Sequence, residues 1–262
     1  MDAPSGAYLQ IDVDMRGRAF SDGAPDCNGW ELYDVIDAVA YAKQHYAPWI
    51  SNPEVVFFAA GSGGGGNAYA IACKFPDYFA QVTALCGISD YRLWYDHDAV
   101  GEFRDEMNVW IGDRSHDDAY RARSGIDLLP NLCAPLAIVH GETDCRVPCE
   151  QARRFVARAA ALGKSDRVTY LELPGVGAQG HWSNITPEQE RLRDDFCASA
   201  QQTHCTPVQI PRRGTMMVGG YLFTKAFSVV LDSIDDFGKA TYDLDAMTFQ
   251  LDRPGTITVL GK

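Results

Sequence analysis

The chain has 262 residues, which is enough for one large domain or for one domain with a small addition. Its apolar share of 46% and charged share of 22% are ordinary for a globular protein, and the formal net charge of −12 argues against a nucleic-acid ligand. No apolar run approaches the roughly 20 residues of a membrane-spanning helix, so we expect no membrane partner. Residues 1–10 lack the basic region and apolar core of a signal peptide, so we expect none in this chain.

Apolar runs of strand length alternate with helical patterns over most of the chain. The central runs are apolar throughout, which is typical of strands buried on both faces of a parallel sheet. Strand and helix in alternation predict right-handed crossovers, the α/β class and a doubly wound, mostly parallel sheet. In chain order we expect strand 7–15, helix 31–46, strand 54–60, helix 67–75, strands 81–88 and 134–141, helix 149–163 and strand 167–175.

The pattern changes after about residue 205. Short runs of β-branched and aromatic residues then alternate with Gly, Asp and Pro turns, which predicts four to six antiparallel strands. Fewer than about 60 residues form a marginal core alone, so we expect this extension to pack on the main domain or on another subunit. We therefore divide the chain into a main α/β domain, 1–204, and a β-rich extension, 205–262.

The sequence does not decide whether the eight cysteines are free thiols or form disulfides. Cys145 with Cys149, or Cys197 with Cys205, could form a disulfide in an oxidising compartment, but an even count does not establish one. No cysteine and histidine cluster has the spacing of a zinc site, so we expect no metal. Nothing in the sequence calls for a nucleotide or flavin, and we expect no cofactor.

The strand at 54–60 runs directly into a glycine-rich turn that carries Ser62. A buried strand, a sharp turn of small residues with a serine, and then a helix are the context of a nucleophile elbow. The backbone N–H of Gly63 would face the oxyanion of a tetrahedral intermediate at the positive end of that helix. A flexible linker or a phosphate loop is the alternative, but no GK[ST] follows and a linker would not interrupt a βα unit.

Asp144 follows the strand at 134–141 and is placed to reach the active edge of a parallel sheet. There it could accept the N–H of a histidine and stabilise the imidazolium. The alternatives are that Asp144 only caps the next helix, or that Glu142 takes the catalytic place.

His181 lies in a glycine-rich loop after the strand at 167–175, where it could swing over the sheet edge to act as general base. The chain order serine, aspartate, histidine is that of α/β-hydrolases. We expect His140 to shape the turn beside Gly141. The remaining histidines lie in polar or helical contexts and are expected at the surface: His45, His97, His116 and His204.

These stretches together resemble the catalytic domain of the prolyl oligopeptidase family within the α/β-hydrolases. The resemblance rests on IDVDMRGRAFSDG, on AGSGGGGNAYA with the residues that follow it, on APLAIVHGETDCRVP and on LPGVGAQGHW, and it spans roughly residues 7–200. It implies a fold of the α/β-hydrolase type, a Ser62, Asp144 and His181 triad, and the amide of Gly63 as one oxyanion donor.

Members of this family normally have strands before the one expected at 7–15, and a loop there supplies a second oxyanion donor. The resemblance therefore implies that the catalytic domain, 1–204, is N-terminally incomplete. Loss of one such donor costs on the order of 10²–10³ in kcat. We consider three explanations: the chain is a fragment, a second chain or copy completes the sheet, or the C-terminal extension refills the gap.

The favoured function is hydrolysis of a carboxylic ester by a serine hydrolase, with a small-molecule ester or peptide as substrate. The chain holds no propeller of the kind that filters peptides in larger relatives, which favours the ester. The alternatives are a peptidase of the same mechanism and a non-catalytic interaction protein that retains the fold. Residues 90–110 either line the substrate pocket or form a packed helical cap, and we expect Tyr91, Trp94 and Tyr95 to contact the substrate.

Overall fold

The computed structural model describes residues 8–98 and 101–260. Four parallel strands form one sheet in the order β1-β2-β3-β4, and six antiparallel strands form a second sheet in the order β10-β7-β6-β5-β8-β9. The strands of the first sheet are β1 (Phe57–Gly61), β2 (Gln81–Leu85), β3 (Leu136–Gly141) and β4 (Val168–Leu173). Those of the second are β5 (Arg213–Gly219), β6 (Tyr221–Phe223), β7 (Phe227–Leu231), β8 (Phe237–Asp243), β9 (Thr248–Leu251) and β10 (Gly255–Val259).

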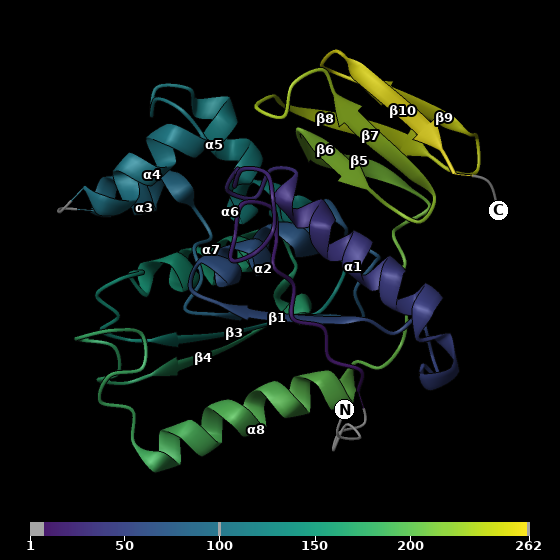
Figure 1. Ribbon diagram of the computed structural model, residues 1–262. Helices are drawn as coiled ribbons and strands as arrows, with labels where there is room; N and C mark the ends of the chain where they lie inside the picture. The colour runs from purple at the N-terminus through teal and green to yellow at the C-terminus, as the bar shows by residue number, and fades with distance from the viewer. Residues whose placement is uncertain (1–7, 99–100, 261–262) are drawn as a thin grey trace.

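Helices cover both faces of the parallel sheet. In Figure 1, α8 lies alone below the strands, while α1, α2 and α7 lie above them. The α-helices are α1 (Glu31–His45), α2 (Gly63–Lys74), α3 (Tyr91–His97), α4 (Glu102–Trp110), α5 (Asp117–Arg123), α6 (Gly125–Leu128), α7 (Glu150–Ala161) and α8 (Pro187–Thr203). Short 3-10 turns are η1 (Ala47–Trp49), η2 (Leu129–Asn131) and η3 (Ser165–Arg167). This arrangement confirms the predicted α/β class, with antiparallel strands at the C-terminal end.

Burial explains why the middle of the parallel sheet forms where the sequence predicts it. All six residues of β3 and four of the five in β2 are buried, so their apolar side chains leave water on both faces of the sheet. Helix α2 is buried from Gly65 to Lys74 and packs on β1 and β2. Among the described residues no helix is both long and apolar enough to cross a bilayer.

The expected first strand is wrong for the part of it that is described; residue 7 lies outside the described residues. Residues 8–15 contain no strand, and no backbone hydrogen bond joins 8–14 to β1. The ring of Tyr8 contacts Phe57 edge-on, but Tyr8, Leu9 and Ile11 are exposed. The apolar run reports only on side chains, whereas a strand also needs a backbone ladder.

The C-terminal extension forms the predicted antiparallel strands and packs on the main part of the chain, beyond α1 and α2 in Figure 1. Met217 exchanges two hydrogen bonds of 2.7 Å with the side chain of Asn131, and Tyr221 Oη donates to the carbonyl of Gly29 at 2.7 Å. Its strands pair only with one another in the described part of the chain, so the explanation that this extension refills the gap beside β1 is wrong. Completion of the sheet by another chain and the boundary at residue 205 stay predictions.

Candidate active site

Ser62 stands at the sharp turn between β1 and α2. Its backbone has φ 58° and ψ −121°, a left-handed conformation that costs a non-glycine residue of order 1–3 kcal/mol. Its N–H donates to the carbonyl of Leu85 at 2.9 Å, which fixes the turn on the neighbouring strand. Strain of this kind at a serine between a strand and a helix is typical of a nucleophile elbow.

The glycine run after Ser62 has a steric cause at its third member. A Cβ on Gly65 would lie 2.6 Å from both the Cα of Gly87 and the carbonyl oxygen of Leu85. Helix α2 therefore approaches the backbone after β2 more closely than any side chain allows. By contrast, a Cβ on Gly63 would meet no atom within 4 Å, because this residue faces open space beside the serine.

Asp144 lies in the loop after β3, and its side chain is fully buried. Its Oδ1 accepts the backbone N–H groups of Arg146 at 2.9 Å and Val147 at 3.1 Å. Burial alone would raise the pKa of this carboxyl, but the hydrogen bonds from His181 and from the two backbone amides outweigh it and lower the pKa. Asp144 is therefore held as a carboxylate.

His181 joins Asp144 to Ser62. Its Nδ1 lies 2.6 Å from Asp144 Oδ2 and its Nε2 lies 2.8 Å from Ser62 Oγ. The two loops can meet because Gly177, with φ +114°, passes so close that a Cβ there would lie 2.6 Å from the Cα of Asp144. The three residues predicted from three separate motifs thus form one contact chain.

Glu142, the alternative to Asp144, lies outside this contact chain, and so does His45, which was expected at the surface. Glu142 is exposed, and its Oε2 accepts the N–H of Gly175 at 2.8 Å. His45 is exposed and binds the carbonyl of Tyr41 through Nδ1. Neither residue touches the Ser62, His181 and Asp144 contact chain.

A cavity of about 310 Å³ opens beside Ser62. Tyr91 and Trp94 line it, as do Gly63 and Gly64 at the first turn of α2. The first N–H groups of a helix have no partner within the helix, so Gly63 can donate to an oxyanion here.

Tyr95 requires a correction, because it does not line this cavity among the described residues. It follows Trp94 on α3, so its side chain points about 100° further round the helix. Its ring packs edge-on against Tyr120, and its hydroxyl lies 3.3 Å from Asn108 Oδ1. Tyr95 lies four residues after Tyr91, so helix periodicity alone would group the two, and the packing of Tyr95 on Tyr120 of α5 is what removes it from the cavity.

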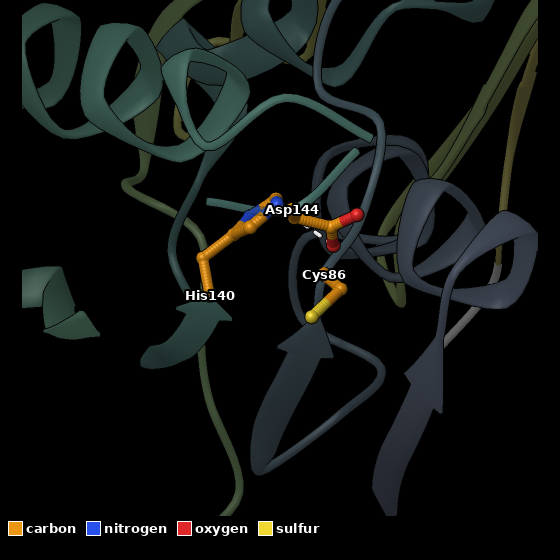
Figure 2. Close-up of side chains that lie close together, drawn as sticks. All are labelled: Cys86, His140 and Asp144. Atoms are coloured by element: carbon orange, nitrogen blue, oxygen red, sulfur yellow. Dashed lines mark ion pairs between the residues drawn. The ribbon is translucent and has the colours of Figure 1, made fainter. Parts of the chain in front are cut away.

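His140 and Cys86 approach Asp144 from the sheet (Figure 2). Their potential ligand atoms and a carboxylate oxygen of Asp144 lie within 4.8 Å of one another, the spacing of a possible metal site. However, His140 Nε2 is 2.9 Å from the carbonyl of Val147, where only a donating N–H suits an oxygen acceptor. Burial raises the pKa of the Cys86 thiol, and Asp144 already holds His181, so these side chains do not fit a metal centre.

The cavity also contains residues that the sequence analysis did not single out. Phe103, Glu106, Met107 and Trp110 recur at the i, i+3, i+4 and i+7 spacing of one helix face, and that spacing in residues 102–110 was the available signal. Arg18 and Arg146 line the cavity from two loops and gave no signal, because loop residues have no periodicity.

The sequence profile of the prolyl oligopeptidase family matches residues 7–197. The chain belongs to the prolyl oligopeptidase family. This confirms the resemblance, within the α/β-hydrolase superfamily, and places the chain in the class of serine hydrolases, which includes esterases and peptidases. Esterase LipC of Mycobacterium tuberculosis is 31% identical over 162 residues, which are 56% of this chain and 40% of that protein.

Esterase LipQ of the same organism is 25% identical over 166 residues, which are 58% of this chain and 39% of that protein. The chain thus spans about two-fifths of the length of these curated relatives. Among solved structures, an acylaminoacyl peptidase in complex with Z-Gly-Gly-Phe-chloromethyl ketone superposes with a TM-score of 0.59 at 22% identity. Pyrococcus horikoshii acylaminoacyl peptidase in its orthorhombic form gives 0.60 at 20% identity. Each comparison covers 69% of this chain and 28% of the other, and it bears on the fold alone.

Proposed function

We propose that this chain hydrolyses a carboxylic ester through an acyl-enzyme on Ser62, with His181 as base and Asp144 as the acid that orients it. The observation that carries the proposal is the contact chain from Ser62 Oγ through the imidazole to the buried carboxylate, at 2.8 and 2.6 Å. These are the distances that proton transfer from a hydroxyl to an imidazole requires.

The first half of the reaction forms the acyl-enzyme. Ser62 Oγ attacks the ester carbonyl while His181 Nε2 takes the hydroxyl proton, and Asp144 stabilises the imidazolium through Nδ1–H. The oxyanion of the tetrahedral intermediate accepts the N–H of Gly63 at the positive end of α2. His181 then returns the proton to the departing alkoxide, which leaves as the alcohol.

The second half releases the acid. His181 takes a proton from water, the hydroxide attacks the acyl carbonyl, and the second tetrahedral intermediate collapses with Ser62 Oγ as leaving group. The proton held by His181 returns to that oxygen, which regenerates the serine. Over the two halves, the ester and one water become the alcohol and the acid, and Ser62 and His181 return to their starting protonation states.

The choice of an ester is supported by two curated relatives that are named as esterases. Family membership supports the second candidate, a peptidase with the same residues in the same roles. An ester needs less help at the leaving group than an amide, since an alkoxide leaves more readily than an amine anion. A site with one described oxyanion donor therefore favours the ester.

The test is labelling with a fluorophosphonate probe, followed by the rates on an activated ester and on the anilide of the same acid. We expect Ser62→Ala to abolish labelling, and Ser51→Ala, at an exposed serine away from the site, to leave it unchanged. Ser62-dependent cleavage of the anilide, and not merely of the activated ester, would select the peptidase. A folded wild-type chain that is never labelled would favour the interaction protein, because even a partial site leaves about 10³-fold catalysis over water.

A further inference from the structure

The cavity beside Ser62 has a wall of aromatic rings. Trp94 stacks on Phe103 with ring centroids 4.4 Å apart, and Tyr91 meets Trp94 edge-on at 6.1 Å. Trp110 extends this wall by two turns along α4. An apolar or aromatic part of a ligand would lose water against these rings.

Two guanidinium groups lie at the same wall. The Cζ of Arg18 is 5.0 Å from the ring centroid of Trp110, and the Cζ of Arg146 is 5.2 Å from that of Phe103. The two arginines come from different loops and stack on opposite ends of one face of α4. No hydrogen bond or ion pair to the described residues occupies their side-chain N–H groups, which can bind a planar anion while each guanidinium stays over its ring.

Neither arginine forms an ion pair with a carboxylate of residues 8–98 or 101–260. Other arginines do: Arg16 pairs with Asp34, and Arg153 pairs with Glu172. Acidic residues outnumber basic ones by 35 to 23, so unpaired guanidinium groups beside a catalytic serine are not explained by a lack of carboxylates.

Two acids also line the cavity, and neither satisfies the arginines. Glu31 is buried, and its oxygens already accept N–H groups from Asp26, Asn28 and Asn67. Glu106 is exposed on α4, where it can turn to solvent, and it makes no ion pair within the described part of the chain. The N-terminal end of α2 adds partial positive charge on the other side of the cavity.

Building on the proposed ester hydrolysis, we propose that the cavity selects esters whose acyl group carries a second, free carboxylate, bound by Arg18 at the Trp110 end of the wall or by Arg146 at the Phe103 end. The carbon chain of such a half-ester lies along the aromatic wall, and the scissile carbonyl lies at Ser62. The chemical class is therefore a monoester of a dicarboxylic acid.

The test compares p-nitrophenyl monoesters from succinic to suberic acid, each beside the ester of the monocarboxylic acid with the same number of carbons. At the best chain length we expect kcat/KM to favour the carboxylate ester by about tenfold or more, as for charge-assisted hydrogen bonds. Of Arg18→Gln and Arg146→Gln, the one that removes the binding guanidinium should lower this ratio about tenfold. Arg154→Gln removes an exposed arginine of α7 and should leave the ratio unchanged.

Glu106→Gln should raise the ratio, because it removes the exposed negative charge from the same wall. Added salt should lower it in the wild type, since the two arginines are exposed. Ser62-dependent turnover with no preference for the carboxylate, or a preference that survives both arginine substitutions, would overturn this inference and leave the proposed hydrolysis standing. Loss of fluorophosphonate labelling at Ser62 in the folded wild type would instead remove the proposed function itself.

Discussion

The imidazole of His140 lies 3.6 Å from the carboxylate of Asp144, across the first turn of the loop that carries the acid. Its Nε2–H donates to the carbonyl of Val147 at 2.9 Å, while the N–H of Val147 donates to Asp144. The buried His140 thus fixes the position of Val147, which in turn holds the Asp144 carboxylate that binds His181. Burial lowers the pKa of His140, so it stays neutral and does not compete as a charged partner.

We predict that His140→Phe lowers kcat about tenfold with a smaller change in KM. The substitution leaves the buried carbonyl of Val147 without its donor, which costs about 1–3 kcal/mol and loosens the position of Asp144. Steady-state kinetics with denaturant unfolding measure both effects. His45→Phe is the control at an exposed helix end, and an unchanged kcat in His140→Phe would refute the positioning role.

We predict that Asp144→Asn lowers kcat by roughly 10³–10⁴-fold, because an amide cannot hold the required imidazole tautomer or stabilise the imidazolium. Glu142→Gln removes the carboxylate that was the alternative candidate for the catalytic acid in the same loop, and this variant should retain wild-type rates. Single-turnover rates on an activated ester give both values. Equal losses in the two variants would mean that the loop, and not the carboxylate of Asp144, is what matters.

Substitution of two glycines in the first turn of α2, Gly63 and Gly65, should affect thermal stability differently. Gly65→Ala would push a Cβ to 2.6 Å from the backbone at Gly87, and overpacking of this kind costs about 1–3 kcal/mol. Thermal unfolding should show a fall of roughly 2–4 °C per kcal/mol. Gly63→Ala places its Cβ in open space and should unfold near the wild-type temperature. Because alanine favours a helix more than glycine does, a similar fall in both variants would mean that the close approach at Gly65 is not the cause.

Lys74 gives a prediction about pH. It is fully buried between α2 and the C-terminal sheet, donates to the carbonyl of Asn28 at 2.9 Å and lies 4.3 Å from the ring of Tyr221. Burial, with a smaller contribution from the positive charge of Arg123, lowers its pKa from 10.5 to about 7. Above pH 7 the unfolded chain then binds more protons than the folded one, so stability rises with pH until the unfolded lysine also titrates.

The wild type should therefore gain stability relative to Lys74→Met by up to about 1.4 kcal/mol per pH unit between about pH 7 and 10. Below pH 7 both states hold the proton, and the difference between wild type and variant should level off. Urea unfolding under reducing conditions at about pH 6, 8 and 9.5 measures this. A difference that does not change with pH would mean that Lys74 keeps an ordinary pKa in the folded chain.

The sequence by itself determined the α/β class and the catalytic candidates. Strands buried on both faces are mostly apolar, so β2 and β3 are readable from composition even though they also bury Gln81, Thr83 and His140. The glycines around Ser62 are readable because a strained turn and a close backbone approach exclude side chains. The order of Ser62, Asp144 and His181 along the chain then predicted which residues to bring together.

Only the tertiary structure decided the rest. Whether residues 8–15 join the sheet depends on a backbone ladder, which side-chain patterns do not encode. The separation of Tyr95 from Tyr91 and Trp94 depends on which helix face meets the cavity. Arg18 and Arg146 line the same cavity from loops far apart in sequence, because the placement of loops follows from how the elements pack and not from any local period.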